Sequence, residues 1–511
     1  MSLLKAYDFK KKSKQKKPKL EEADDLLAEI EKIAVSEEVA KMWMEDPCLP
    51  PDSIIETEDG PQRIADIQVG AKVLTHKGFH KVSKTYSREF NGELIALTPY
   101  YSNMPLLLTP SHPVLAIKTI KKCYYNKHFG ICLPTCSVKN KICNEPYKQY
   151  RIEWIPASQL EKGDAVAIGT VSEEKEITIN LSDFAPKAYF EFGDYLVYAL
   201  TRKIDKNKLE RLKELYLAGV SKEKIKQELG IKSDWTFYHW LARLGLKTKK
   251  LPDYKIKIPK QIKVDGAFAR LAGYYVAEGC IRGGNQIDFS FNRNEESLIN
   301  DVICLVRSIF NLENASVKPI GNCVRVSFTC KPVTNMFHAL FGARAELKQL
   351  PSWFIKLPRK VLWQFIYGYF LGDGYMATSG RHGLEAKTAS LTLARQIRSI
   401  LHKLGVPAGI HHIKREGKSY QYKGRKIIAH DAYVITIPST FAAKILKHLG
   451  KTPTSPCRRR EYGFKLGGHL FVCLKKVEKI PYNGLVYNLA VNPAETYVAE
   501  GIIVHNCGRP C

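Results

Sequence analysis

Two short apolar runs near the C-terminus lead into the triplet His505-Asn506-Cys507, and this triplet constrains the chain more than any other feature. The runs cover residues 485–489 and 497–504. An Asn side-chain amide can attack its own backbone carbonyl, a His can polarise that carbonyl or move a proton, and a Cys supplies a thiol just beyond the bond that would break. The triplet can therefore cut and rejoin peptide bonds, provided that the fold brings an upstream partner to it.

The upstream partner is a second cysteine, Cys48, which opens a strand-like run. Further along, Thr109 and His112 form a Thr-x-x-His pattern between apolar runs. These pieces occur in the order of the motifs of an intein, a protein-splicing element, and the chain resembles that family. The resemblance implies that residues 48–506 excise themselves and join their flanks without a cofactor. The catalytic residues that it implies are Cys48, Thr109, His112, His505, Asn506 and, in the following flank, Cys507.

The chain is strongly basic, with 79 Lys and Arg against 51 Asp and Glu and a formal charge of +28. This balance favours a polyanionic partner, most simply nucleic acid, although a merely soluble basic protein is the alternative. No apolar run reaches the roughly 18 residues of a membrane span, and residues 1–19 lack a signal-peptide core. Thirteen scattered cysteines are typical of reduced thiols. We expect a soluble, cytoplasmic protein with no membrane partner.

We expect a multidomain α+β fold with a split all-β splicing domain. Residues 48–169 hold short strand-like runs separated by turn residues, which predict a compact all-β unit. Residues 470–506 add runs of the same kind, so the two halves must meet to place Cys48 beside Asn506. The intein resemblance implies that this unit has the horseshoe-shaped Hint fold.

Residues 207–246 are a helical segment of a different character. Ser221 and Ser233 stand at N-cap positions and Gly230 at a turn, in a pattern that resembles a helix-turn-helix. The third helix would then face a DNA major groove, and a small structural helical bundle is the alternative. The DNA-binding candidates are Lys232, Ser233, Thr236, His239 and Arg243.

Two matching apolar segments occupy residues 271–279 and 366–374. In each, small residues on one face would allow two helices to approach closely, and a single acid near the end is followed by Gly. Glu278 and Asp373 would thus meet at one place, where two carboxylates can share divalent cations against a phosphodiester. A lone helix of this type would more often belong to a core, but packing alone does not account for the duplicate.

These segments resemble the paired signature of LAGLIDADG homing endonucleases. The resemblance implies that Glu278 and Asp373 are catalytic ligands of Mg²⁺ or another divalent cation, and that two repeats over about 265–450 bind double-stranded DNA, the host gene without its insertion. It also implies a monomer with a pseudo-twofold endonuclease. Lys348 is the candidate to stabilise transition-state charge, with an ordinary surface lysine as the alternative. In the second repeat, the choice among Lys418, Lys423, Lys426 and others stays open.

The predicted domains follow from these assignments. They are an N-extein 1–47, a first splicing half 48–170, a linker with the helix-turn-helix 171–255, an endonuclease domain 256–455, a second splicing half 456–506 and a C-extein 507–511. A DNA-binding regulator built on the helix-turn-helix and a degenerate intein without endonuclease activity are the alternative functions.

Three residues depart from what splicing favours. Asn488 and Glu495 stand where the intein family often has Asp and His, and Asn cannot act as a general base. Pro47 restricts the carbonyl that Cys48 would attack. We therefore expect slow or temperature-dependent splicing.

A cysteine cluster inside the first splicing half could hold a tetrahedral zinc ion. Its spacing is irregular and contains no Cys-x-x-Cys pair, so unligated or cross-linked thiols are the alternative, and the cluster stays outside the predicted site. Its members are Cys123, Cys132, Cys136 and Cys143.

Overall fold

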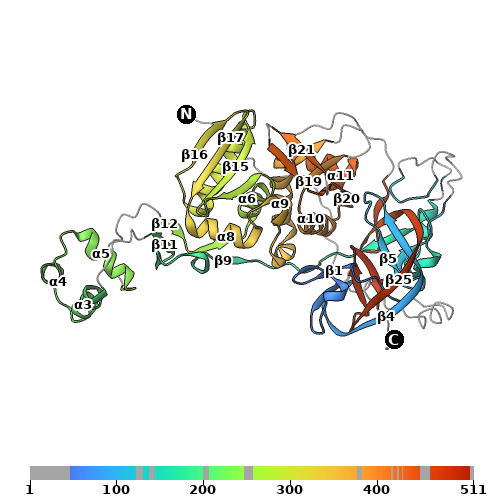
Figure 1. The fold of residues 1–511 in the computed structure, drawn as a ribbon, viewed down its shortest axis with the longest axis horizontal. Coiled ribbons are helices and arrows are strands. Elements are labelled where there is room, and N and C mark those ends of the chain that lie inside the picture. The colour runs from blue at the N-terminus through green and yellow to red at the C-terminus, as the bar shows by residue number, and fades with distance from the viewer. Residues whose placement is uncertain are drawn as a thin grey trace, which may run out of the picture.

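The computed structural model shows an extended molecule with a β body at one end, an α/β body in the middle and a small helical unit at the other end (Figure 1). It describes residues 47–121, 130–136, 143, 145–198, 206–246, 257–376, 383–415, 418–422, 425–428, 430–448 and 461–506. Within those ranges no helix is long and apolar enough to cross a membrane.

The β body joins strands from the two ends of the chain, which appear as interleaved blue and red ribbons in Figure 1. Its strands, in chain order, are β1 (Ile54–Thr57), β2 (Gly60–Arg63), β3 (Lys72–Thr75), β4 (Gly78–Pro99), β5 (Leu106–Leu108), β6 (Pro113–Ile117), β7 (Glu153–Pro156), β8 (Ala165–Ile168), β24 (Gly463–Leu466), β25 (His469–Val491), β26 (Thr496–Ala499) and β27 (Ile502–His505). The sheet is antiparallel in order β24-β25-β4-β3-β1-β26-β27-β8-β6-β7, with β2 on β1 and β5 on β4. The predicted meeting of two chain-distant halves is therefore present.

Two strands are much longer than the predicted short runs. β4 and β25 contain 22 and 23 residues and pair along almost their whole length as a two-stranded ribbon. Their ends are buried, whereas their middles alternate between exposed and half-buried side chains. Polar residues interrupt the apolar pattern there, which is why the sequence indicated separate short strands.

The small helical unit contains α3 (Lys206–Leu217), α4 (Lys222–Leu229) and α5 (Asp234–Arg243) around an apolar core of its own. Ser233 caps α5, because its Oγ accepts the Thr236 N–H at 3.1 Å, and Gly230 ends α4 with φ of 67°. Three strands, β10 (Tyr189–Phe192), β11 (Tyr195–Tyr198) and β12 (Lys257–Pro259), form a sheet beside it. β9 (Thr178–Asn180) and β13 (Gln261–Lys263) pair next to the middle body.

The middle body is built from two units of the same topology. The first comprises α6 (Gly266–Glu278), β14 (Gly279–Arg282), β15 (Gln286–Asn292), α7 (Glu296–Phe310), β16 (Ser316–Ile320), β17 (Cys323–Thr329) and α8 (Lys331–Phe341). The second comprises α9 (Arg359–Gly372), β18 (Gly374–Met376), β19 (Leu384–Thr388), α10 (Leu391–Lys403), β20 (Gly409–Ile413), β23 (Ala432–Ile437) and α11 (Ser439–His448), with the hairpin β21 (Ser419–Tyr422) and β22 (Arg425–Ile428) inserted before β23. The sheet orders, β14-β15-β17-β16 and β18-β19-β23-β20, correspond strand for strand. The duplication thus extends from one helix to a whole unit.

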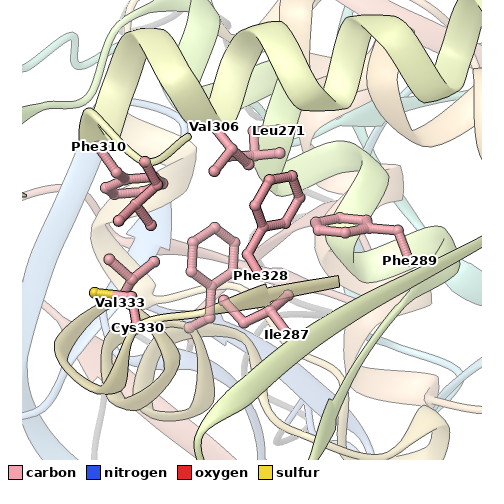
Figure 2. Close-up of a pocket in the computed structure, with 10 residues that line it drawn as sticks. Leu271, Ile287, Phe289, Val306, Phe310, Phe328, Cys330 and Val333 are labelled. Carbon is pink, nitrogen blue, oxygen red and sulfur yellow. The ribbon is translucent and has the colours of Figure 1, made fainter. Parts of the chain in front are cut away.

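Helices α6 and α9 cross at close range at the centre of this body (Figure 1). A Cβ on Gly368 would lie 2.2 Å from the Arg270 carbonyl oxygen, and one on Gly273 would lie 2.4 Å from that of Phe365. The small residues predicted for this seam are therefore needed for the helices to approach. One continuous apolar core runs through both units. Figure 2 shows an apolar cavity in the first unit, with Leu271 and Phe328 among its lining side chains.

The second unit docks on the β body through α10. Arg398 and Arg395 reach the carboxylates of Glu56 and Glu500, with Nη2–Oε1 distances of 3.4 and 2.9 Å. All four side chains are 6–11% exposed. Lys356 adds a salt bridge to Glu58. Buried ion pairs are therefore part of the junction between the two bodies.

Candidate functional site

Cys48 is 1% exposed, and its peptide unit is held by Thr109. The Cys48 N–H donates to Thr109 Oγ1 at 2.8 Å, and Thr109 Oγ1 donates to the Cys48 carbonyl at 3.3 Å. The Thr109 N–H donates to the same carbonyl at 3.0 Å. The nitrogen that would leave in an attack by Cys48 is therefore fixed by a hydroxyl that can both accept and donate.

The carbonyl before Cys48 has a side-chain partner that sequence reasoning did not foresee. Asn488 Nδ2 donates to the Pro47 carbonyl at 2.5 Å, and Asn488 is fully buried. On the other side of its amide, Oδ1 accepts the Leu489 N–H and the Tyr497 O–H, both at 2.8 Å. The sequence predicts only the loss of a carboxylate at Asn488, whereas the Asn488 amide nitrogen contacts the Pro47 carbonyl itself. The sequence signal was the position of Asn488 in an otherwise apolar run.

His112 lies where strand register brings the two ends of the β body together. Val504 of β27 pairs with Val114 of β6, so residues just outside these strands are neighbours. The ring is completely buried, and burial lowers the pKa of His112 to about 3, while the backbone groups of Cys48 and His505 act in the opposite direction. His112 is therefore neutral near pH 7 and can take a proton and pass it on.

His505 and Asn506 end β27 in the same region. His505 Nδ1 lies 2.7 Å from the Asn506 carbonyl oxygen, and because a carbonyl only accepts, Nδ1 carries the hydrogen. Burial lowers the pKa of His505, and the Trp154 ring meets its edge with centroids 4.9 Å apart. The His505 ring is thus positioned to polarise the Asn506 carbonyl. Cys507 lies outside the described residues.

The Asn506 side chain is held by backbone groups. In the orientation that pairs each donor with an acceptor, its nitrogen donates to the Glu495 carbonyl at 2.8 Å and its oxygen accepts the Val491 N–H at 2.9 Å. The Asn506 N–H donates to the same Glu495 carbonyl at 2.8 Å. Glu495 adopts φ of 52°, and its side chain is exposed. Its backbone carbonyl therefore holds Asn506, while its carboxylate acts to raise the pKa of His505 against the effect of burial.

Glu278 and Asp373 lie at the ends of the crossing helices α6 and α9. Those ends are close, because a Cβ on Gly372 would be 3.1 Å from Glu278 Cγ. Burial, with the Glu295 carboxylate, raises the pKa of Glu278 to about 7. Burial, with the Glu278 carboxylate, raises the pKa of Asp373 to about 8, although Lys348 acts against this rise. The two neighbouring carboxyl groups are costly to ionise together, and a divalent cation shared between them would offset their repulsion.

Lys348 is 3% exposed, so the alternative of a surface lysine is wrong. Its Nζ donates to the carbonyls of Tyr275 and Gly279 at 2.8 and 2.9 Å and lies 3.4 Å from the Tyr275 ring centroid. Burial lowers the pKa of Lys348 to about 7, while Cys280 and Asp373 raise it. The lysine is therefore beside the end of α6 that carries Glu278.

The DNA-binding candidates of the helical unit differ in exposure. Lys232 and Ser233 are exposed, and Thr236 and Arg243 are half-buried. His239 is 2% exposed and stacks on Trp235, with centroids 4.8 Å apart. The expectation that His239 faces a groove is wrong, because its ring packs between Trp235 and Phe190 and fills the contact with β10.

The remaining candidate groups carry less weight. Cys123 and Lys423 lie outside the described residues, Lys418 is exposed, and of Lys426 only the backbone is described. Cys132, Cys136 and Cys143 are half-buried, and among the residues that the structure covers no three His, Cys, Asp or Glu side chains are grouped to hold a metal ion. The two-carboxylate pair is the cation candidate that the geometry supports.

Comparisons with known proteins bear on the second unit directly. Residues 360–450 match the family described as LAGLIDADG-like domain. The chain carries a LAGLIDADG-like domain. The match begins in α9 and extends through α11, and the first unit, α6 to α8, repeats its topology.

Three curated relatives are similar over larger parts of the chain. An uncharacterized protein of Methanocaldococcus jannaschii is 29% identical over 91% of this chain and 50% of its own. An ATP-dependent DNA helicase of Thermococcus kodakarensis is 25% identical over 90% of this chain and 36% of its own. A DNA polymerase of Thermococcus litoralis is 28% identical over 48% of this chain and 16% of its own. The chain thus spans half or less of the length of these relatives.

A solved structure of I-DmoI, described as a complex with its target DNA in the presence of Mn, is similar to part of the chain. It is 16% identical, with a TM-score of 0.27, over 37% of this chain and 97% of that one.

Proposed function

We propose that residues 48–506 form an intein that excises itself and joins its flanks. The observation that carries the proposal is the convergence on one region of the Pro47 carbonyl, its attacking cysteine Cys48, the pair Thr109 and His112, and the terminal Asn506. These groups come from opposite ends of the chain, and packing of the β sheet alone does not require that they lie next to one another. The Hint fold for the β body and the predicted domain limits belong to the same proposal.

The proposed chemistry exchanges one peptide bond for another. Cys48 Sγ attacks the Pro47 carbonyl, and Thr109 and His112 hold the peptide and return the thiol proton to the departing nitrogen. Cys507 Sγ then attacks the thioester carbonyl of Pro47, so the N-terminal flank moves to Cys507 and the Cys48 sulfur leaves with the proton as a free thiol. Asn506 cyclises through its side-chain amide while His505 polarises its carbonyl, which releases residues 48–506. The remaining thioester rearranges to a peptide bond between Pro47 and Cys507.

The relatives support an element that moves between hosts. About nine-tenths of this chain aligns with roughly a third of a DNA helicase, and about half of it aligns with a small part of a DNA polymerase. A segment shared by proteins of different name, each of which is much longer than the shared part, is what an inserted element predicts.

An intact-mass measurement on freshly expressed full-length chain tests splicing. We expect two products under reducing conditions, residues 48–506 and the joined flanks. Cys48→Ala should prevent joining and still permit some cleavage after Asn506, whereas Asn506→Ala should stop at a branched chain or release only the N-terminal flank. A chain that stays whole after prolonged warming would refute the proposal.

We further propose that the middle body is a metal-dependent, site-specific double-strand DNA endonuclease. The residues that would hold a divalent cation, Mg²⁺ being the first to test, are Glu278 and Asp373, and such a cation supplies a Lewis acid at the phosphate. Lys348 offers positive charge beside them. The proposed target is the host gene without the insertion. The proposed enzyme is a monomer whose two units are related by an approximate twofold axis.

Carboxylate substitutions separate cleavage from folding. Asp373→Asn and Glu278→Gln each remove one charge without changing the helix seam, so cleavage of DNA carrying the joined-flank sequence should fall by orders of magnitude while DNA binding persists. Glu296→Gln, an exposed carboxylate on α7, is the matched control and should cleave normally. Cleavage at the parent rate by Asp373→Asn would show that Asp373 is not part of the catalytic site.

A DNA-binding regulator built on α3–α5 is the second candidate, and the exposed Lys232, which precedes the N-cap residue of α5, favours it. It predicts DNA binding without cleavage and a chain that never splices. Within the intein proposal, the same unit adds DNA affinity, so Lys232→Ala with Arg243→Ala should weaken binding and lower its salt dependence. Splicing should be unchanged in that variant. Cytoplasmic localisation is part of the intein proposal as well.

A further inference from the structure

Asn488 contacts the carbonyl at which the first bond exchange of the proposed splicing reaction would begin. Its Nδ2 lies 2.5 Å from the Pro47 oxygen, in a position with no solvent exposure. A carbonyl oxygen only accepts, so the amide nitrogen must be the group that faces it. The contact is present before any chemistry has taken place.

The direction of this amide is set by two other donors. The Leu489 N–H and the Tyr497 O–H both point at Asn488 Oδ1 from 2.8 Å. A flipped amide would place its NH₂ group against those two donors and its oxygen against the Pro47 oxygen. Tyr497 is itself fully buried and lies on β26, in the hairpin that ends in His505 and Asn506. The nitrogen is therefore held toward Pro47 by groups on β25 and β26.

We propose that Asn488 is the catalytic oxyanion donor of the first splicing step, and that Tyr497 is a positioning residue that aims it. The inference rests on the proposed splicing function. In that step a bond forms between Cys48 Sγ and the Pro47 carbonyl carbon, the Pro47–Cys48 C–N bond breaks, and the thiol proton moves to the leaving nitrogen. No electrons are gained or lost. While both bonds coexist, negative charge develops on the Pro47 oxygen, where Asn488 Nδ2 already lies.

This geometry accounts for an amide at a position where a carboxylate is usual. An ionised Asp at position 488 would set a negative charge against the developing oxyanion and would have no hydrogen to donate. The Tyr497 and Leu489 donors would instead stabilise its charge. Asn488 thus lacks the general base that a carboxylate would supply, but it provides a hydrogen-bond donor to the Pro47 oxygen.

Thioester formation isolates this step. In an Asn506→Ala and Cys507→Ala background, the reaction stops at the Cys48 thioester, which hydroxylamine cleaves to release the N-terminal flank. We expect Asn488→Ala to slow release by about 10²-fold, the typical effect of removing one oxyanion donor. Tyr497→Phe should slow it by about tenfold, the loss of one ordinary hydrogen bond. Asn483→Asp, on an exposed site of the same strand, is the matched control and should react normally.

Two further measurements distinguish catalysis from structure. Asn488→Asp preserves the shape of the side chain but replaces the amide donor with a carboxylate. Thioester formation in this variant should be slowest relative to the parent at alkaline pH, where the carboxylate is ionised. The difference between the two rates should become smaller at lower pH, because a protonated carboxyl can donate a hydrogen bond. Cleavage after Asn506, measured in a Cys48→Ala background, should be unaffected by Asn488→Ala, since that step uses a different carbonyl. An equal loss in both steps, or full thioester formation by Asn488→Ala, overturns the inference while splicing itself stands. If the parent background forms no thioester at all, the proposed function fails, and this inference fails with it.

Discussion

Burial decides what several single residues in this chain can do. Lys348 is one of many lysines in the sequence, but a 3% exposed ammonium held by two carbonyls and a tyrosine ring has a pKa lowered to about 7. His239, in contrast, is removed from the DNA-binding candidates because it packs against Trp235 and Phe190. Residue type indicated the available chemistry, and solvent access selected among the candidates.

Buried neutral histidines should make the folded chain sensitive to acid. His402 is 4% exposed with Nε2 3.0 Å from the Ala408 carbonyl, and burial lowers its pKa from 6.5 to about 3. Between these two pH values the unfolded state binds a proton that the folded state does not, so this contribution to stability is present above about pH 6.5 and declines as pH falls toward 3.

The change His402→Gln tests that contribution. It should reduce the pH dependence of the urea unfolding midpoint between pH 7 and pH 5 by the equivalent of about 2 kcal/mol. His430→Gln, at an exposed histidine, should leave the pH dependence as it is. Identical slopes for His402→Gln and the parent protein would contradict the assignment.

At the scale of elements, strand register and helix contact bring distant residues together. Register between β27 and β6 places His112 near the end of β27, and an antiparallel bridge between Leu49 and Tyr487 brings Pro47 to Asn488. The α6–α9 crossing does the same for Glu278 and Asp373. A one-residue shift of a strand would turn its side chains to the other face, so these sites depend on pairing that is correct along its whole length.

The helix seam should not tolerate a single added methyl group. Gly368→Ala places Cβ 2.2 Å from the Arg270 carbonyl, a backbone atom that cannot move alone, so the helices must separate. We expect a loss of about 1–3 kcal/mol in stability and a strong loss of DNA cleavage, because Glu278 and Asp373 move apart.

Gly266→Ala is the control on the same helix pair. Its Cβ would meet Gln364 Cγ at 3.0 Å, a flexible side chain that can turn away. Thermal unfolding and cleavage assays should therefore show a near-neutral effect. Equal tolerance of alanine at Gly368 and Gly266 would show that close approach of the helices is not required.

At the scale of the whole molecule, the two large bodies share a charged, buried junction. Arg398 lies 3.4 Å from Glu56, and Arg395 lies 2.9 Å from Glu500, in the turn that leads into β27. Burial raises the pKa of Glu56 even though Arg398 lowers it, so its carboxylate depends on the arginine. The helix α10 thus supports a strand of the proposed splicing site from outside the β body.

Removing only one partner of the Arg398–Glu56 ion pair should lower the stability of the protein more than removing both partners does. Arg398→Gln leaves Glu56 buried without its main counter-charge, with an expected loss of about 3 kcal/mol in stability. Adding Glu56→Gln should recover a large part of that loss, because no buried charge is then left unpaired. Urea unfolding of the two single variants and the double variant measures the coupling, and strictly additive losses would show that the pair does not interact.

The sequence by itself determined the chemistry that is available and its order along the chain. The resemblance of short motifs to the intein family points to Cys48, Thr109, His112, His505 and Asn506, and a repeated helical pattern points to Glu278 and Asp373, because these signals are local. Tertiary structure alone decided which groups touch. The contact of Asn488 with Pro47 joins residues from opposite ends of the chain, the 22- and 23-residue ribbon strands gain their length by pairing with each other, and the junction at α10 exists only after both bodies have folded. Such contacts are set by long-range register and burial, which no short stretch of sequence encodes.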